Sequence, residues 1–400
     1  STHELAIYIM ILYWVMMTFS GMIAKTFRAK KEIAISQTGL LFGSIVRVSF
    51  ILFVALNSLG TLALALAYFA GEFAHTIINL ILFKRRKHKI SKPSTNYALE
   101  YCHFAFPLAI VVASTLIIKN ADKVIIQLFW SASDVGYYTA GYKITNFIMS
   151  FIGSLTILLL PTYSSYHSNK NQKAIIDLTY KSERYLSMII FPMIFGIITL
   201  AKPATDILLN KWIGVAPLLR ILPIFVLFVA LESPYQTQFI GMNHPKLARN
   251  RVIIMVIINL VLNLILIPSD IRSLGIYNMP GLGAMGAVIA TVFAYFAGLI
   301  YSRIKAYQLT GIKGNWKIIL HGISASIMAL ALHLIMDYGL FSVDRWYHLL
   351  AFSIFGLGIY LLFLFILKEF TKEDYYFFMD TLNANKMFAY IRDELKKKEE

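Results

Sequence analysis

Long apolar runs are the feature that most constrains the fold of this chain. Stretches of about 20 predominantly apolar residues, the length that crosses the hydrocarbon core of a bilayer, recur throughout its 400 residues. Only 14% of the residues are charged, whereas a soluble domain carries about 25%. A membrane β-barrel needs strands that alternate apolar and polar residues, and these runs do not alternate. The sequence therefore predicts an all-α, polytopic membrane protein.

Window hydropathy, with charges and Pro or Gly as boundaries, predicts about eleven membrane-spanning helices. They are expected at 5–24, 34–57, 60–83, 101–129, 136–160, 185–205, 217–240, 252–268, 282–302, 316–337 and 347–367. No signal peptide precedes the first of them, and the chain begins with Ser rather than Met. The sequence therefore looks like one from which earlier helices are missing.

Basic residues assign the two sides of the membrane. Of the 37 Lys and Arg residues, 28 lie in segments on one side and 4 in the connections on the opposite side. The basic segments are 25–33, 84–97, 161–184, 241–251, 303–317 and 368–400. Such an excess marks the cytoplasmic side. We therefore expect a multi-pass protein of the cell membrane with its C-terminus in the cytoplasm and residue 1 outside.

The net charge of +16 does not indicate nucleic-acid binding. Its basic residues sit in short loops beside the spans, where they set topology and contact anionic lipid. Membrane lipid is therefore the expected partner, and nucleic acid is not.

Residues for catalysis or metal binding are missing from the sequence pattern. The chain has one Cys, nine His without metal-ligand spacing, and no Gly-rich phosphate loop. No extramembrane segment exceeds about 33 residues, and the longest outer connection has about 13. An oligosaccharide polymerase would require a larger outer loop. We expect no enzyme, no cofactor and no metal site, and transport that is downhill or driven by a gradient.

A short sequence echo suggests an internal repeat. The motif AYFAG occurs at Ala67–Gly71 and again at Ala294–Gly298, in two predicted helices that both run toward the cytoplasm. A repeat of six helices would make these positions equivalent, a common plan in transporters. The predicted divisions are a partial N-terminal lobe at 1–83, a basic linker at 84–100, a six-helix lobe at 101–312, two additional helices at 313–370 and a cytoplasmic amphipathic tail at 371–400.

One predicted span carries a polar stripe. Helical spacing within 136–160 places on one stripe Thr139, Lys143, Asn146, Ser150, Gly153 and Ser154. Small residues could serve close helix packing. A charge near mid-bilayer costs about 2.5–3.5 kcal/mol, however, and packing needs no cation. Lys143 therefore favours a stripe that lines a cavity, with Thr139 and Asn146 beside it.

Other polar residues inside the spans have structural and functional readings that both stay open. Lys119 and Asp122 are spaced for an intrahelical ion pair. Arg47 and Glu72 could pair between helices, and Arg220 lies close to the outer end of its span. Glu232 is the candidate for a protonatable or cation-binding carboxylate. Asn259 and Asn263, one turn apart, are expected to join helices.

Several blocks of the sequence resemble a known transporter family. They are ADKVIIQLFWSASDVGYYTAGYKI (121–144), FAFPLAI (104–110), GMNHPKLARNRVIIMVIINLVLNLILIP (241–268), GLGAMGAVIAT (281–291) and TFRAKKE (26–32). In order and spacing they resemble the oligosaccharide-lipid and O-antigen flippases of the MOP superfamily, which also includes the MATE drug exporters.

The resemblance implies a MATE-like bundle of two helical lobes with fourteen helices, of which this chain holds about eleven. It implies that a polyprenyl-diphosphate-linked oligosaccharide crosses the membrane by alternating access. Lys143, Asn146, Thr139, Lys119, Arg47 and Arg220 would then bind the substrate, and Asp122, Glu232 and Glu72 would be structural or coupling carboxylates. Enzymes of glycan assembly are further possible partners. The alternative is a MATE-like proton- or sodium-coupled antiporter of drugs or cations.

Overall fold

The computed structural model describes residues 2–30, 32–86, 94–156, 159–209, 212, 214–272, 275–339, 341–372 and 374. These residues form fourteen α-helices, and β-structure among them is limited to one isolated bridge between Ile271 and Ile276. Nine helical segments of the described chain are long and apolar enough to cross a membrane. The predicted all-α class is therefore confirmed.

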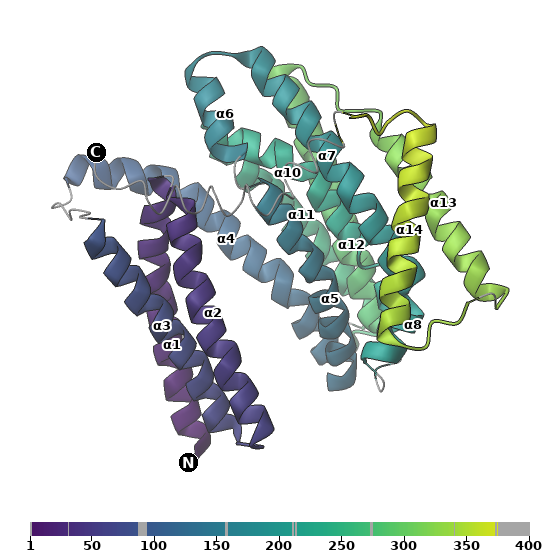
Figure 1. The fold of residues 1–400 in the computed structure, drawn as a ribbon, viewed down its shortest axis with the longest axis horizontal. Coiled ribbons are helices and arrows are strands. Elements are labelled where there is room, and N and C mark those ends of the chain that lie inside the picture. The colour runs from purple at the N-terminus through teal and green to yellow at the C-terminus, as the bar shows by residue number, and fades with distance from the viewer. Residues whose placement is uncertain are drawn as a thin grey trace. The chain divides into compact units, whose positions relative to one another are not determined.

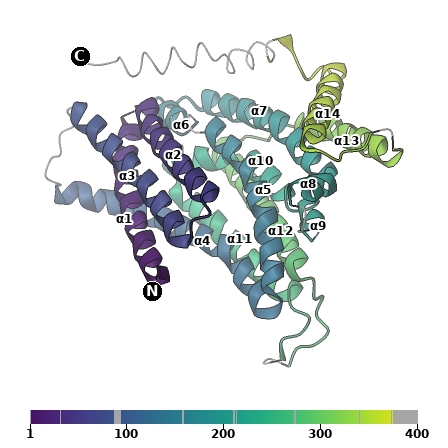
Figure 2. The same cartoon turned by 60° about the horizontal axis from the view of Figure 1, so that its bottom comes forward.

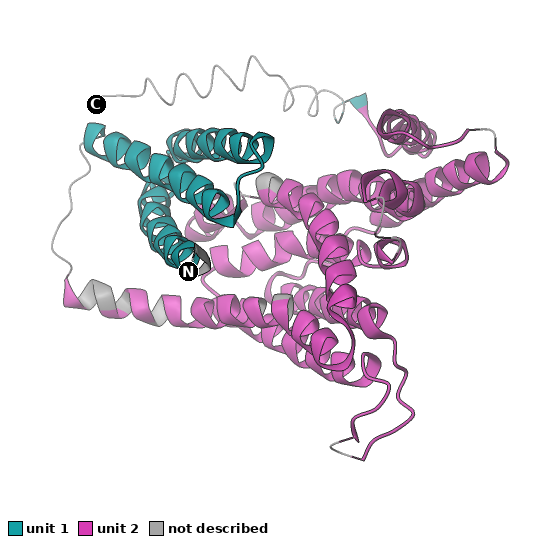
Figure 3. Ribbon diagram, turned by 90° about the horizontal axis from the view of Figure 1, so that it is seen from below, with its two compact units in different colours: residues 1–93, 372–400 teal, residues 94–371 magenta. Residues whose placement is uncertain are grey.

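The chain divides into two compact units, residues 1–93 with 372–400 and residues 94–371 (Figure 3). Unit 1 contains α1 (Thr2–Ala29), α2 (Ile33–Leu56) and α3 (Thr61–Arg85). Helix α3 packs against both others. Its contact with α2 is close because glycines meet there: a Cβ added at Gly71 would lie 2.9 Å from the carbonyl oxygen of Gly43.

Unit 2 contains the other eleven helices. They are α4 (Thr95–Phe129), α5 (Ala132–Thr156), α6 (Leu159–Ser168), α7 (Gln172–Thr199), α8 (Ala201–Leu208), α9 (Val215–Leu219), α10 (Ile224–Gly241), α11 (Pro245–Leu266), α12 (Gly283–Thr310), α13 (Ile318–Asp337) and α14 (Trp346–Ile366). Helix α12 packs against α10 and α11, α11 packs against α4, and α10 packs against α7. Helices α13 and α14 pack against each other and against α7 (Figures 1 and 2).

Each predicted span overlaps a helix, but three short helices were not predicted. Helices α6 and α8 follow α5 and α7 directly. The predicted span 217–240 is broken, because α9 ends at Leu219 and α10 begins at Ile224. Pro223 stands just before α10, where proline is tolerated at a helix start but disfavours helix in the residue before it.

Helices α4 and α5 are predicted spans that are not among the nine candidate membrane spans found in the described part of the chain. The described apolar stretch of α4 is limited to Ala105–Ser114, and α5 carries the polar stripe. The further division of unit 2 into a six-helix lobe and two additional helices stays a prediction. The predicted tail lies almost wholly outside the described residues.

Candidate functional site

Helix α5 has one buried and one uncovered face within unit 2. Tyr138, Thr145, Ile148 and Ile152 are at most 5% exposed, and they recur at the spacing of a single helical face. This face packs against α4, α9, α10 and α12. On the opposite face Phe147 is 67% exposed. The elements of unit 2 therefore hold α5 in a fixed rotation.

The polar stripe lies on the face that unit 2 leaves uncovered. Lys143 is exposed, and Thr139 and Asn146 are partly buried. Among the described residues, none makes a hydrogen bond or ion pair with Lys143. The side chain of Ser154 lies outside the described part of the chain. Unit 2 therefore presents a cation without a counter-ion beside small and amide side chains.

The other predicted cations are dispersed. Arg47 belongs to unit 1, where it donates to Ser44 at 3.4 Å and lies over the ring of Tyr68. Arg220 is exposed in the turn between α9 and α10. Lys119 lies on α4, but its side chain falls outside the described residues, so its proposed pairing with Asp122 stays a prediction.

Asp122 joins four helices of unit 2. The carboxylate is 1% exposed. It accepts hydrogen bonds from Asn263 on α11 at 2.5 Å, from Thr291 on α12 at 3.0 Å and from Tyr138 on α5. Asn263 also donates to Asn259 at 3.1 Å. The two asparagines thus join helices, as the sequence predicted, and a buried carboxylate forms the centre of the network.

Two replacements of Asp122 test whether its carboxylate holds the four helices together as a hydrogen-bond acceptor. Asp122→Ala is expected to lower the stability of the purified protein, measured by thermal unfolding in detergent. The change leaves buried donors of Tyr138, Thr291 and Asn263 without their acceptor, which costs about 1–3 kcal/mol for a single unsatisfied group. Asp122→Asn keeps an acceptor oxygen and should unfold at a higher temperature than the alanine variant. Equal unfolding temperatures for the two variants would contradict the positioning role.

Glu232 is paired in the structure, and its role as a protonatable or cation-binding carboxylate stays a prediction. It is 1% exposed on α10 and forms an ion pair with Arg251 of α11. Ser302 of α12 donates to it at 3.0 Å. The sequence had placed Arg251 in a cytoplasmic segment, but the arginine lies within α11 and is 6% exposed. The pair fixes three helices to one another.

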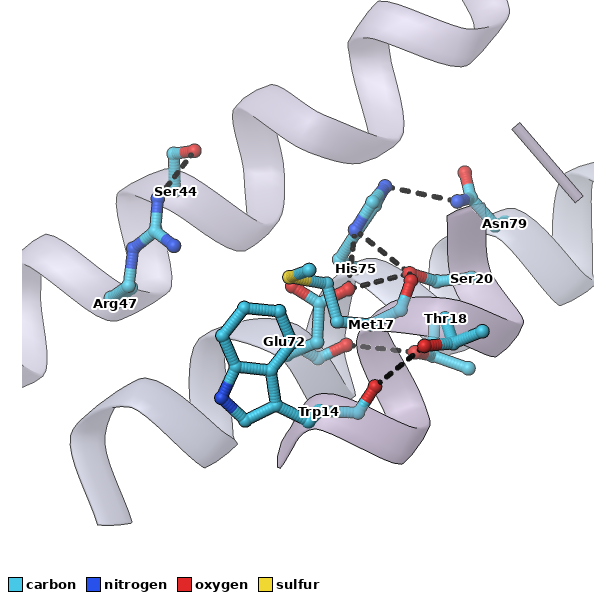
Figure 4. Close-up of polar contacts among 10 residues, drawn as sticks. Trp14, Met17, Thr18, Ser20, Ser44, Arg47, Glu72, His75 and Asn79 are labelled. Carbon is cyan, nitrogen blue, oxygen red and sulfur yellow. Dashed lines mark hydrogen bonds and ion pairs between the residues drawn. The ribbon is translucent and has the colours of Figure 1, made fainter. Parts of the chain in front are cut away.

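Glu72 does not pair with Arg47, which corrects the second predicted ion pair. Ser20 of α1 donates to its carboxylate at 2.5 Å, and Nδ1 of His75, one turn along α3, lies 2.9 Å away. The amide nitrogen of Asn79 lies 3.0 Å from Nε2 of the same ring. Figure 4 shows these four side chains together, with Arg47 directed toward Ser44. Three of them, Glu72, His75 and Asn79, are spaced i, i+3 and i, i+7 on α3, whereas Ser20 comes from α1.

A pocket of about 540 Å³ lies in unit 2 at the ends of α10 and α12. Tyr235, Arg303 and Lys313 are among its lining residues. Arg303 forms an ion pair with Glu183 of α7, and the backbone N–H of Asn315 donates to the same carboxylate at 3.0 Å. The sequence assigned Glu183 and Arg303 to loops, so this pair was not predicted.

Nearby, Glu369 links the end of α14 to the rest of unit 2. It is 1% exposed and pairs with Arg184 of α7 at 2.5 Å and with Lys317 at 3.0 Å. Of the three buried carboxylates within the described spans of unit 2, Asp122 is satisfied by neutral donors, and Glu183 and Glu232 by arginines. Lys143 takes part in none of these interactions.

Comparisons with known proteins agree with this architecture. A family model described as polysaccharide biosynthesis protein matches residues 4–217. The probable low-salt glycan biosynthesis flippase Agl15 of Haloferax volcanii is 26% identical over 181 residues, which are 44% of this chain and 34% of that protein. The chain therefore spans about a third of the length of this curated relative.

Solved structures show the fold. The lipid II flippase MurJ in an inward closed conformation matches with a TM-score of 0.60 and 14% identity, covering 92% of this chain and 84% of that one. A MATE transporter in a bent conformation matches with a TM-score of 0.61 and 15% identity, covering 76% and 69%. The predicted MATE-like helical fold is confirmed.

Proposed function

Since the chain belongs to the polysaccharide biosynthesis protein family, we propose that it moves a polyprenyl-diphosphate-linked oligosaccharide across the cytoplasmic membrane by alternating access. The relative Agl15 carries the name of a glycan biosynthesis flippase, and MurJ that of a lipid II flippase. Both names point to a lipid-linked glycan as the class of substrate.

The charge balance of unit 2 is the observation that carries this proposal. Its buried carboxylates are satisfied internally, whereas Lys143 stands exposed on the polar stripe without a described partner. A diphosphate needs cations, and an ammonium group is a compact donor for phosphate oxygens. Thr139 and Asn146 beside it supply hydroxyl and amide groups suited to sugar hydroxyls. The lipid tail stays in the bilayer.

The basic segments support the orientation of the protein. Their excess on one side indicates that the C-terminus lies in the cytoplasm, where the precursor is loaded. Enzymes that assemble the glycan on that side are the proposed partners. The protein itself carries the finished precursor and performs no bond-making step.

A MATE-like antiporter of drugs or cations is the second candidate, because MATE transporters share the fold. A cation carrier requires an available carboxylate in its cavity. Glu232 and Glu183 are occupied by Arg251 and Arg303, and Asp122 by hydrogen bonds. This occupancy favours an anionic substrate.

Reconstituted vesicles distinguish the two candidates. Lipid-linked oligosaccharide is loaded in both leaflets, and a lectin added outside reports how fast the inner pool becomes accessible. We expect accessibility to rise with the protein and not in empty vesicles, whereas efflux of a cationic dye under an imposed pH or sodium gradient should not exceed that of empty vesicles. Dye efflux without movement of the oligosaccharide would reverse the assignment.

A further inference from the structure

The polar cluster of unit 1 contains a carboxylate and an imidazole in direct contact inside an apolar bundle. Glu72 and His75 are each 7% exposed, and Ser20 and Asn79 are fully buried. A buried, ionisable pair in a membrane span is costly and is normally retained for a function. The flanking helices can close without such groups, since α2 and α3 already meet through Gly43 and Gly71.

From this geometry we propose that Glu72 and His75 form a proton-binding site in unit 1. In the form with one ring proton, Nδ1 donates to Glu72 and Nε2 accepts from the amide nitrogen of Asn79, and the pair carries one negative charge. A proton from water that binds to Nε2 turns the ring into an imidazolium, and the pair becomes neutral overall.

The surroundings are built to accept both forms. Nε2 is the ring atom that changes from acceptor to donor, and its neighbour Asn79 has an amide with a donor and an acceptor end. The oxygen of that amide is buried without a hydrogen-bond partner. A half-turn of the amide brings this oxygen to Nε2, so the second form requires no movement of a helix.

Space for the amide comes from a glycine of the neighbouring helix. A Cβ built on Gly39 of α2 would lie 2.2 Å from the oxygen of Asn79 and 3.3 Å from the ring of His75. Ser20 holds the carboxylate from the side of α1 at 2.5 Å. All three helices of unit 1 therefore contribute to the pair, and a change in its charge acts on each of them.

The other described charged side chains of unit 1 do not neutralise Glu72 by direct contact. From α1 only Ser20 reaches it, because Glu4, Lys25 and Arg28 are exposed. From α2 the nearest cation is Arg47, which acts on Glu72 through space but donates to Ser44. Neutralisation of the carboxylate through direct contact is thus left to His75. Coupling of this proton to transport rests on the proposed function, but proton binding does not.

The test reads the protonation of His75 directly, in the full-length chain in lipid nanodiscs with ¹⁵N-labelled histidine. The signals of His75 are identified by their loss in His75→Gln. We expect them to change as the pH is lowered and Nε2 takes up its proton. In Glu72→Gln the ring should stay neutral over the same series of pH values, because the carboxylate that balances the imidazolium is gone.

A matched control is available on α13. His333 lies 3.2 Å from Asp337, one turn away, and both side chains are exposed. His333→Gln should leave the signals of His75 unchanged. A ring of His75 that keeps one protonation state throughout, or that charges equally in Glu72→Gln, would overturn the site.

Coupling is measured separately in vesicles, as the rate of oligosaccharide flipping with and without a pH gradient. Glu72→Gln is expected to flip at one rate in both conditions, whereas the wild type responds to the gradient. A response retained in Glu72→Gln would disprove coupling through this pair. Vesicles in which no variant flips would contradict the proposed function and leave the spectroscopic result standing.

Discussion

Replacing Lys143 by alanine is expected to slow the flipping of a lipid-linked oligosaccharide by about ten- to a hundredfold. Lys143 is exposed on the uncovered face of α5 and has no partner among the described residues. The variant therefore breaks none of the hydrogen bonds or ion pairs of the described residues, and the expected loss is the contact with an anionic head group. A hydrogen bond to a charged group contributes about 1.5–3 kcal/mol, and each 1.4 kcal/mol is about a factor of ten.

Two further variants show whether the effect belongs to this position. Lys143→Arg keeps a cation that binds phosphate well and should retain most of the activity. Lys202→Ala removes another exposed lysine, on α8, and should flip at the wild-type rate. The proposal fails if Lys143→Ala flips normally at an equal amount of folded protein. Equal losses in Lys143→Ala and Lys202→Ala would instead indicate a general effect of surface charge.

The helices could be predicted from the sequence because a bilayer leaves a chain few choices. Backbone groups in hydrocarbon must be satisfied within the segment, so each long apolar run becomes a helix. The break between α9 and α10 at Pro223 was missed, since window hydropathy averages over a local backbone interruption. The short helix α6 was also missed, because it is too polar and too short to resemble a span.

The partners of the polar residues were harder to predict than the residues themselves. Asn259 and Asn263 are one turn apart, and their joining role was visible in that spacing. Tyr138 and Thr291 are distant in sequence from Asp122, and only the packing of four helices brings them together. Arg47 and Glu72 lie on neighbouring helices, but hydropathy gives the depth of a residue and not the direction in which it points.

Arg251 shows why charged residues at the ends of spans are misread. A window that ends a span at the first strong charge placed this arginine in a loop, whereas α11 begins six residues earlier, at Pro245. Its guanidinium reaches Glu232, which the sequence had left without a partner. The two partners of this buried ion pair were therefore divided between a predicted loop and a predicted functional site.

Removal of the Arg251 side chain is accordingly expected to destabilise unit 2 strongly. Arg251→Met leaves the carboxylate of Glu232 buried with Ser302 as its remaining described donor. Breaking one side of a buried ion pair costs about 3–5 kcal/mol, because the partner stays uncompensated. The measurement is unfolding in mixed micelles with increasing SDS, followed by tryptophan fluorescence. Arg272→Met is the matched control, since its pair with Asp270 is 83% exposed on the arginine side and should contribute about 1 kcal/mol or less.

The double variant Arg251→Met with Glu232→Gln tests why stability is lost in Arg251→Met. If an uncompensated charge is the cause, neutralising Glu232 should restore most of the stability, because glutamine still accepts from Ser302 and a neutral pair needs no counter-ion. If the double variant is as unstable as Arg251→Met, the arginine acts through the packing of its side chain between α10, α11 and α12.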